Sequence, residues 1–188
     1  MGLKLKTAPT TEPITLAQAK LHCRVDHNDE DTLFDALIVA ARQHCEGVQN
    51  RAYITQTWEL WLDNFPNKDY IEIPLPPLQS VTSVTYYDTN DDDDTFDDYD
   101  VDTNSFVGRI VLKYNKSWPY IILRPSNAVV IEFVAGYGNA AAVPQTVKQA
   151  MLLLISHWYA NRETVLVGTV SRHIELAVDA LLALEGVW

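Results

Sequence analysis

An acidic run at residues 88–102 is the part of the sequence whose side chains most suggest chemistry. It reads DTNDDDDTFDDYDVD and contains nine aspartates and no basic residue. Hard cations such as calcium bind carboxylate oxygens, so Asp91, Asp92, Asp93 and Asp94 are candidate ligands for an adventitious cation. The run lacks the glycine and the final glutamate of an EF-hand loop. We therefore favour the alternative interpretation, a solvated acidic loop at a hairpin tip that is kept soluble by charge repulsion.

Other residue patterns that could support catalysis or cofactor binding are weak. Gly136 and Gly138 are closely spaced, but no Lys-Ser or Lys-Thr step follows them, which indicates a turn rather than a phosphate-binding loop. The sequence has no GxSxG motif and no reactive-cysteine signature. The remaining candidate metal ligands lack the spacing of a zinc site, and they are His22, Cys23, His27, His44 and Cys45. We expect no catalytic residue, no metal and no cofactor, and hence a protein that is not an enzyme.

The composition narrows the class of protein further. The chain has 188 residues, 47% of them hydrophobic, so it can bury a substantial core. Its net charge of −11 falls to −2 without the nine aspartates, and no basic block exists for sequence-specific nucleic-acid binding. The N-terminal residues contain no apolar segment of a secretory signal, and no apolar run is long enough to cross a membrane. These features predict a soluble, non-secreted protein that does not bind membranes.

The element that organises the rest of the chain is a helix predicted over residues 144–163. Pro144 suits the first helical position, and apolar side chains recur at helical spacing from Val147 to Trp158. Leu152 and Leu153 extend the apolar surface beyond one stripe, which is typical of a helix that other elements surround. We therefore expect it to be the central helix of the fold, with its last turn approaching a neighbouring subunit.

Three further helices are predicted at residues 15–24, 31–49 and 174–184. The first begins with Thr15-Leu16-Ala17-Gln18, which fits a capping box. The second is amphipathic, with Val48 on its apolar face and Arg42 on its outer face.

Strands are predicted where the hydrophobic period changes to two or where β-branched residues gather, at residues 54–62, 70–73, 80–87, 99–101, 108–114 and 128–134. The prediction is an α+β fold with a helical core from the N- and C-terminal helices and an inserted, mainly antiparallel β-sheet subdomain. In detail it is a single domain, 1–188, whose parts are an extended arm (1–13), a helical core (14–50 and 144–185) and a β subdomain (53–138) with the acidic loop 88–102.

The order of these elements and several phrases resemble the head–tail connector, or head-completion adaptor, proteins of tailed bacteriophages. The phrases are ITLAQAKLHCRVDHNDEDTLFDALIVAARQHCEG, ITQTWELWLDNFP, IPLPPLQSVTSVTYYD, GRIVLKY, VIEFVAGYG, VPQTVKQAMLLLISHWYANRE and AVDALLAL. The resemblance covers residues 14–184 and rests on packing patterns in a shared order rather than on a chemical signature. The acidic run departs from it, because relatives usually have a shorter turn there.

The resemblance implies a virion structural protein at the head–tail interface, assembled in the host cytoplasm. Its partners would be other copies of itself, which form a ring of twelve subunits. The ring would also bind the portal protein and a stopper, tail-completion protein or tail tube. DNA would pass through the lumen without sequence-specific binding. The alternatives are another virion structural protein, such as a tail terminator or tail-completion protein, and a small metal-dependent hydrolase.

Contacts with neighbouring subunits or with portal are expected near the end of the central helix and at the end of the chain. The loose segment 164–171 has apolar residues but no clear place in a core. The candidate interface residues are Trp158, Tyr159, Arg162, Glu163, Arg172 and Trp188.

Overall fold

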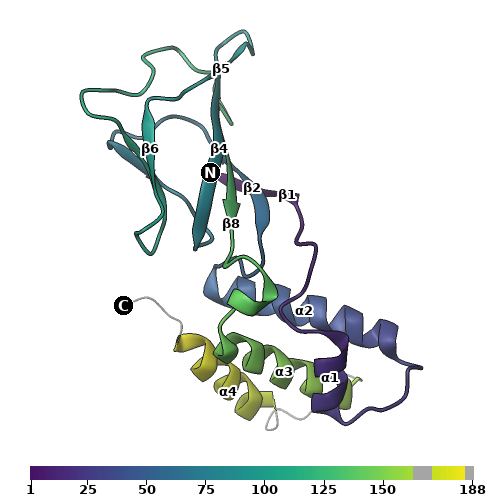
Figure 1. The fold of residues 1–188 in the computed structure, drawn as a ribbon. Helices are drawn as coiled ribbons and strands as arrows, with labels where there is room; N and C mark the ends of the chain where they lie inside the picture. The colour runs from purple at the N-terminus through teal and green to yellow at the C-terminus, as the bar shows by residue number, and fades with distance from the viewer. Residues whose placement is uncertain (163–170, 185–188) are drawn as a thin grey trace. The chain divides into compact units, whose positions relative to one another are not determined.

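The computed structural model describes residues 1–162 and 171–184, with side chains from residue 176 onward in the second range. The chain forms two compact units, and each contains segments that are distant in sequence. The β unit comprises Met1–Pro9 and Thr55–Tyr137, and the helical unit comprises Thr10–Ile54 and Gly138–Trp188. Figure 1 shows the strands in the first and the helices in the second.

The helical unit is built around α3, as the sequence predicts. Its helices are α1 (Leu16–Cys23), α2 (Asp31–Gln49), α3 (Gln145–Ala160) and α4 (Ser171–Ala183), with a short 3-10 turn at Ala140–Ala142. Helix α3 packs against α1, α2 and α4. Its buried side chains follow one continuous stripe and are Val147, Ala150, Met151, Leu154 and Ile155.

Local signals set the ends of the helices before α3. Thr15 caps α1 by accepting a hydrogen bond from Gln18 N–H, and the Gln18 side chain accepts one from Thr15 N–H, which confirms the predicted capping box. Both α1 and α2 end on residues with left-handed backbone geometry, Arg24 and Asn50.

The prediction for the faces of α2 was wrong at two positions. Arg42, predicted on the outer face, is buried and forms ion pairs of 2.7 Å with Glu12 and Glu46. Val48, predicted on the apolar face, is 48% exposed. A buried arginine is stabilised by carboxylates that pair with it. One of these, Glu12, lies outside α2, so the periodicity of α2 alone could not predict the burial of Arg42.

The β unit contains two antiparallel sheets in the described residues. The larger has the order β1-β2-β8-β4-β5, and its strands are β1 (Gly2–Thr7), β2 (Gln56–Leu62), β8 (Val129–Ala135), β4 (Leu78–Tyr87) and β5 (Asp93–Thr95). The smaller has the order β3-β7-β6, and its strands are β3 (Tyr70–Glu72), β7 (Arg109–Leu112) and β6 (Tyr99–Asp102). The core of the large sheet is the apolar face of its central strands, where Leu60, Ile131 and Val84 are adjacent in register and fully buried.

Residues 2–7, predicted as part of an extended arm, form the edge strand β1 of this chain's own sheet. Leu3 and Leu5 alternate with Lys4 and Lys6, which is the period of a strand. Lys6 forms ion pairs with Glu132 on β8 at 2.6 Å and with Glu59 on β2 at 3.7 Å. The strand is therefore held both by backbone pairing with β2 and by charge across the sheet face.

The predicted α+β class is confirmed, because the part of the chain that the structure describes contains four α-helices and two antiparallel sheets. The number of sheets and the course of the acidic run differ from the prediction. The predicted sheet is instead two sheets, and an unpredicted strand, β5, lies within the acidic loop 88–102, where the strand predicted at 99–101 is present as β6.

Candidate interface surfaces

The end of α3, predicted to contact a neighbour, is occupied by a polar cluster within the helical unit. The Tyr159 hydroxyl donates a hydrogen bond of 2.6 Å to Glu30 Oε2, and Arg162 pairs with Glu30 Oε1 at 2.6 Å. The Arg162 guanidinium also lies 4.7 Å from the centre of the Tyr159 ring. Because Glu30 precedes α2, this cluster ties the beginning of α2 to the end of α3.

Electrostatics within the cluster favour an ionised Glu30 and a protonated Tyr159. Hydrogen bonds from Tyr159 and Arg162 lower the pKa of Glu30 below its ordinary value of 4.5. The hydrogen bond to Glu30 raises the pKa of Tyr159, and the same carboxylate raises the pKa of Arg162. A carboxylate that accepts two donors and a phenol that stays protonated reinforce each other, so the cluster is a positioning device and contains no poised acid or base.

The remaining predicted interface residues divide between described and undescribed parts of the chain. Trp158 is half-buried, with its ring edge-on to His44 at 6.0 Å. Arg172 lies in α4, and its side chain is outside the described residues. Glu163, Trp188 and residues 164–170 of the loose segment lie outside the described residues, and its last residue, Ser171, begins α4. The contacts expected of these positions stay predictions.

The four consecutive aspartates of the acidic run do not converge on one point. Asp93 and Asp94 lie in β5, opposite Tyr87 and Tyr86 of β4, so their side chains leave opposite faces of the strand. Asp94 accepts a hydrogen bond of 2.9 Å from the Tyr86 hydroxyl. Within the described part of the chain, no group of three or more His, Cys, Asp or Glu residues is placed to hold a metal ion. The choice between a solvated acidic loop and an adventitious cation at Asp91–Asp94 stays a prediction.

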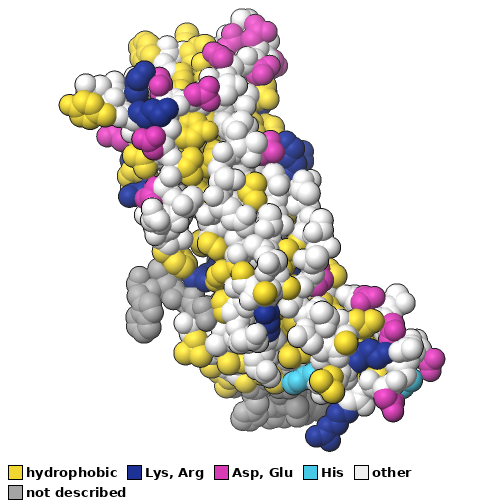
Figure 2. All heavy atoms as spheres, viewed as in Figure 1, with side chains coloured by type: hydrophobic (Ala, Val, Ile, Leu, Met, Phe, Trp, Pro, Cys, Tyr) yellow, Lys and Arg dark blue, Asp and Glu magenta, His cyan; other side chains and the backbone are white. Residues whose placement is uncertain are grey.

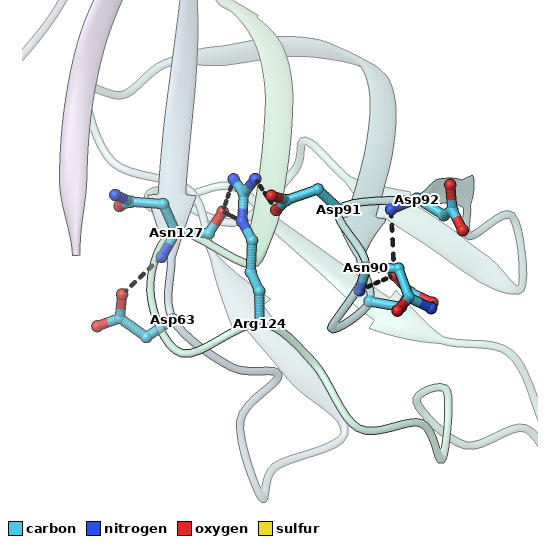
Figure 3. Close-up of polar contacts among 7 residues, drawn as sticks. Asp63, Asn90, Asp91, Asp92, Arg124 and Asn127 are labelled. Atoms are coloured by element: carbon cyan, nitrogen blue, oxygen red, sulfur yellow. Dashed lines mark hydrogen bonds and ion pairs between the residues drawn. The ribbon is translucent and has the colours of Figure 1, made fainter.

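Arg124 joins the acidic run to the loop that precedes β8 (Figure 3). Its guanidinium contacts Asp91 Oδ1 at 3.2 Å and donates to the carbonyl oxygen of Asn127. The guanidinium also stacks over the Tyr87 ring, with its carbon 4.0 Å from the ring centre. Arg124 thus fixes the turn after β4 to the loop before β8.

Two further ion pairs join the acidic run to later residues of the β unit. Asp98 pairs with Lys116 at 2.9 Å, and Asp102 pairs with Arg109 at 2.9 Å. Hydrogen bonds from the Ser105 hydroxyl, Arg109 and the Ser105 and Asn104 amides lower the pKa of Asp102 to about 2. Some of the nine charges are therefore structural rather than merely solvated.

Sequence reasoning missed an exposed apolar loop between β7 and β8. Tyr114 is 92% exposed, and Tyr120, Ile121 and Ile122 follow within the same loop at 108%, 46% and 78%. Apolar side chains of this size in a loop are the usual mark of a contact surface when they gather in one place. The signal in the sequence was the apolar phrase WPYIIL, which contains a proline and fits neither strand nor helix periodicity.

The two cysteines among the candidate metal ligands lie on helices α1 and α2. Cys45 is buried on α2, where burial raises the pKa of its thiol to about 12, and Cys23 at the end of α1 is half-buried. Both belong to helix packing rather than to reactive chemistry.

Among the described residues, no helix is long and apolar enough to span a membrane.

The fold defines an α+β protein, and its β unit exposes large apolar side chains in the loop before β8. A family model described as "Head completion protein" matches residues 12–171. The chain therefore belongs to the head completion protein family, and the predicted resemblance to phage head–tail connector proteins is confirmed. A comparison with curated protein sequences found no match.

Solved structures with the same fold come from gene transfer agent (GTA) particles. A chain in "Neck of native GTA particle computed with C12 symmetry" is 22% identical with a TM-score of 0.80, over 100% of this chain and 96% of that chain. A chain in "Neck of empty GTA particle computed with C6 symmetry" is 22% identical with a TM-score of 0.80, over 96% and 95%. A chain in "Virion of native gene transfer agent (GTA) particle" is 22% identical with a TM-score of 0.82, over 100% and 96%.

Proposed function

We propose that this protein is a head–tail connector that forms a ring below the portal and extends the DNA channel toward the tail. The observation that carries the proposal is the family match over residues 12–171, together with a shared fold in chains from phage-like necks. Those necks were computed with C12 and C6 symmetry, which supports a cyclic assembly and a twelvefold ring. The role is structural rather than enzymatic.

The charge of the chain suits a channel through which DNA passes without sequence-specific binding. The net charge is −11, and Lys and Arg together number 14 against 25 Asp and Glu. A neutral or acidic lumen does not retain a polyanion, whereas a strongly basic one would bind phosphates. DNA transit therefore depends on the ring geometry and not on base contacts.

The proposed partners are other copies of the chain, the portal protein, and a stopper, tail-completion protein or tail tube. A ring subunit has two different faces to cover, which are in contact with different parts of its neighbours. We place Trp158, Arg172 and the residues near Trp188 among these contacts. Tyr159 and Arg162 hold the end of α3, and hence Trp158, in position, because their polar groups bind Glu30.

The proposal is tested by mixing the purified chain with the portal protein from the same particle and imaging the mixture by electron microscopy. We expect a ring seated on the portal, of the portal's symmetry. Sedimentation of the chain as a monomer, with portal migrating separately, would contradict the proposal. Recovery of tail tube instead of portal in a pull-down would favour a tail-terminator or tail-completion role.

The end of the chain is tested separately by removing residues 186–188. We expect this truncation to weaken portal binding while the far-ultraviolet circular dichroism spectrum stays unchanged. Full-strength binding by the truncated chain would remove Trp188 from the interface and would leave the ring proposal standing.

A further inference from the structure

The exposed loop between β7 and β8 carries an apolar surface that we call the apolar tip, made of the consecutive residues Tyr120, Ile121 and Ile122. Tyr120 and Ile122 are almost entirely in solvent, although each has a large apolar surface. Large apolar side chains are normally buried, because their exposure to water is unfavourable. An arrangement that leaves several of them in water within one loop is typical of a surface that a partner covers.

The apolar tip is held in place at both of its ends. On one side, the Trp118 indole N–H donates to the Lys68 carbonyl at 2.7 Å, and the ring stacks on Phe65 with centroids 5.1 Å apart. On the other side, Leu123 forms a β-bridge with Asp88, and the next amide donates to the Tyr87 carbonyl at 3.2 Å. The intervening residues 119–122 are therefore presented from a fixed base, which lowers the entropy that a binding partner must overcome.

The acidic run lies beside both ends of the apolar tip, and we call Asp91, Asp92, Asp93, Asp97 and Asp98 the acidic frame. Basic side chains of the same loop also lie there, because Lys113 donates to the Asp97 carbonyl at 2.9 Å. Lys116 pairs with Asp98 and Arg124 pairs with Asp91. Asp92, Asp93 and Asp97 have no basic side chain within ion-pair distance among the described residues, so their charge is directed to solvent. Figure 2 shows acidic side chains gathered over the end of the β unit that carries β5.

We propose that the apolar tip inserts into an apolar pocket of a different neck protein, and that Lys or Arg side chains line the rim of that pocket. The charge complementarity follows from the acidic frame, and it makes both DNA and anionic lipid poor occupants. This inference rests on the proposed function, because the neck supplies the neighbour.

A second copy of the chain fits the apolar tip less well. An apolar pocket of about 250 Å³ in the β unit has a lining that includes Leu60, Leu62, Ile71, Lys68 and Glu72. Its lining holds one lysine and one glutamate, so it offers no positive rim to an acidic frame. Two acidic frames brought together would also repel each other.

The experiment measures binding of the full chain to the portal protein and, separately, to the next neck protein of the same particle. The test variant is Ile122→Asp, and the matched control is Leu21→Asp, whose side chain is 80% exposed on α1. We expect Ile122→Asp to weaken binding to one of the two proteins by about tenfold or more, and Leu21→Asp to leave it unchanged. Ring formation, measured by native mass spectrometry, should be the same for both variants and the wild type.

A second variant tests the charge of the frame without changing the apolar tip. We expect Asp92→Asn with Asp93→Asn to slow association and to reduce its dependence on salt concentration, because fewer charges then attract the basic rim.

Three results would overturn the inference while the connector role stands. The first is unchanged binding by Ile122→Asp. The second is loss of ring formation by that variant, which would assign the apolar tip to a contact with a second copy. The third is tip-dependent binding to phosphatidylglycerol vesicles and to neither neck protein. A wild-type chain that binds neither neck protein and forms no ring would instead refute the proposed function itself.

Discussion

Tyr159 and Glu30 are separated by 129 residues in sequence, yet the Tyr159 hydroxyl donates a hydrogen bond of 2.6 Å to the Glu30 carboxylate. The Tyr159 ring also packs against Phe34 with centroids 4.7 Å apart. One side chain therefore combines an apolar contact with α2 and a polar contact at its beginning. The last turn of α3 therefore contacts the beginning of α2 within the helical unit, and its predicted approach to a neighbouring subunit stays a prediction.

Tyr159→Phe should keep the ring contact with Phe34 and remove only the hydrogen bond to Glu30. We expect a lower urea midpoint than the wild type at pH 7. Because the pKa of Glu30 is lowered in the folded state, the stabilisation is present above its ordinary pKa of 4.5 and is lost as the pH falls through the folded value. The difference between variant and wild type should therefore shrink below about pH 4.5, which urea titrations at several pH values can measure. A difference that does not depend on pH would mean that the hydrogen bond does not depend on ionisation of Glu30.

Ile155→Ala should destabilise the helical unit strongly. Ile155 is fully buried in α3, and removal of its side chain leaves a cavity between packed helices. The expected cost is about 2–5 kcal/mol in the free energy of unfolding, measured by denaturant titration. Leu176→Ala is the control, because Leu176 is 63% exposed on α4 and should change stability by less than about 0.5 kcal/mol. Equal effects of the two substitutions would contradict the assignment of α3 as the central helix.

Gly108→Ala should destabilise the β unit, because the two sheets approach closely at this residue. A β-carbon there would lie 2.3 Å from the β-carbon of Leu78 at the start of β4. Neither atom can move without shifting a strand, so we expect a cost of about 1–3 kcal/mol by thermal or denaturant unfolding.

Gly47→Ala is the matched control for that substitution. Nothing lies within 4 Å of a β-carbon added at Gly47, which is in α2, so alanine should stabilise the protein by about 0.5–1 kcal/mol. A neutral or stabilising effect of Gly108→Ala would contradict the close approach of Leu78 to Gly108.

Arg124→Gln should loosen the acidic run without unfolding the sheet. The variant loses the ion pair with Asp91 and the stacking on Tyr87. We expect faster amide hydrogen exchange at residues 88–95 and 124–128, with exchange in β2 and β8 unchanged. Lys148→Gln on α3 is the control for removal of one positive charge. Unchanged exchange near Asp91 in Arg124→Gln would show that the arginine does not hold this turn.

The sequence by itself determined the elements whose signals are local. The capping box at Thr15, the apolar stripe of α3 and the strand β2 each depend on residues within a few positions, and all appear where they were expected. The family resemblance also followed from sequence, because the order of packing patterns is preserved along the chain.

Only the tertiary structure decided which partner each element found. Burial of Arg42 depends on Glu12, and closure of α3 depends on Glu30. Pairing of β1 required β2, some fifty residues away, and the solvent exposure of Ile122 depended on anchors at Trp118 and Arg124. Pairings and exposures of this kind arise from long-range contacts, so no local period of the sequence encodes them.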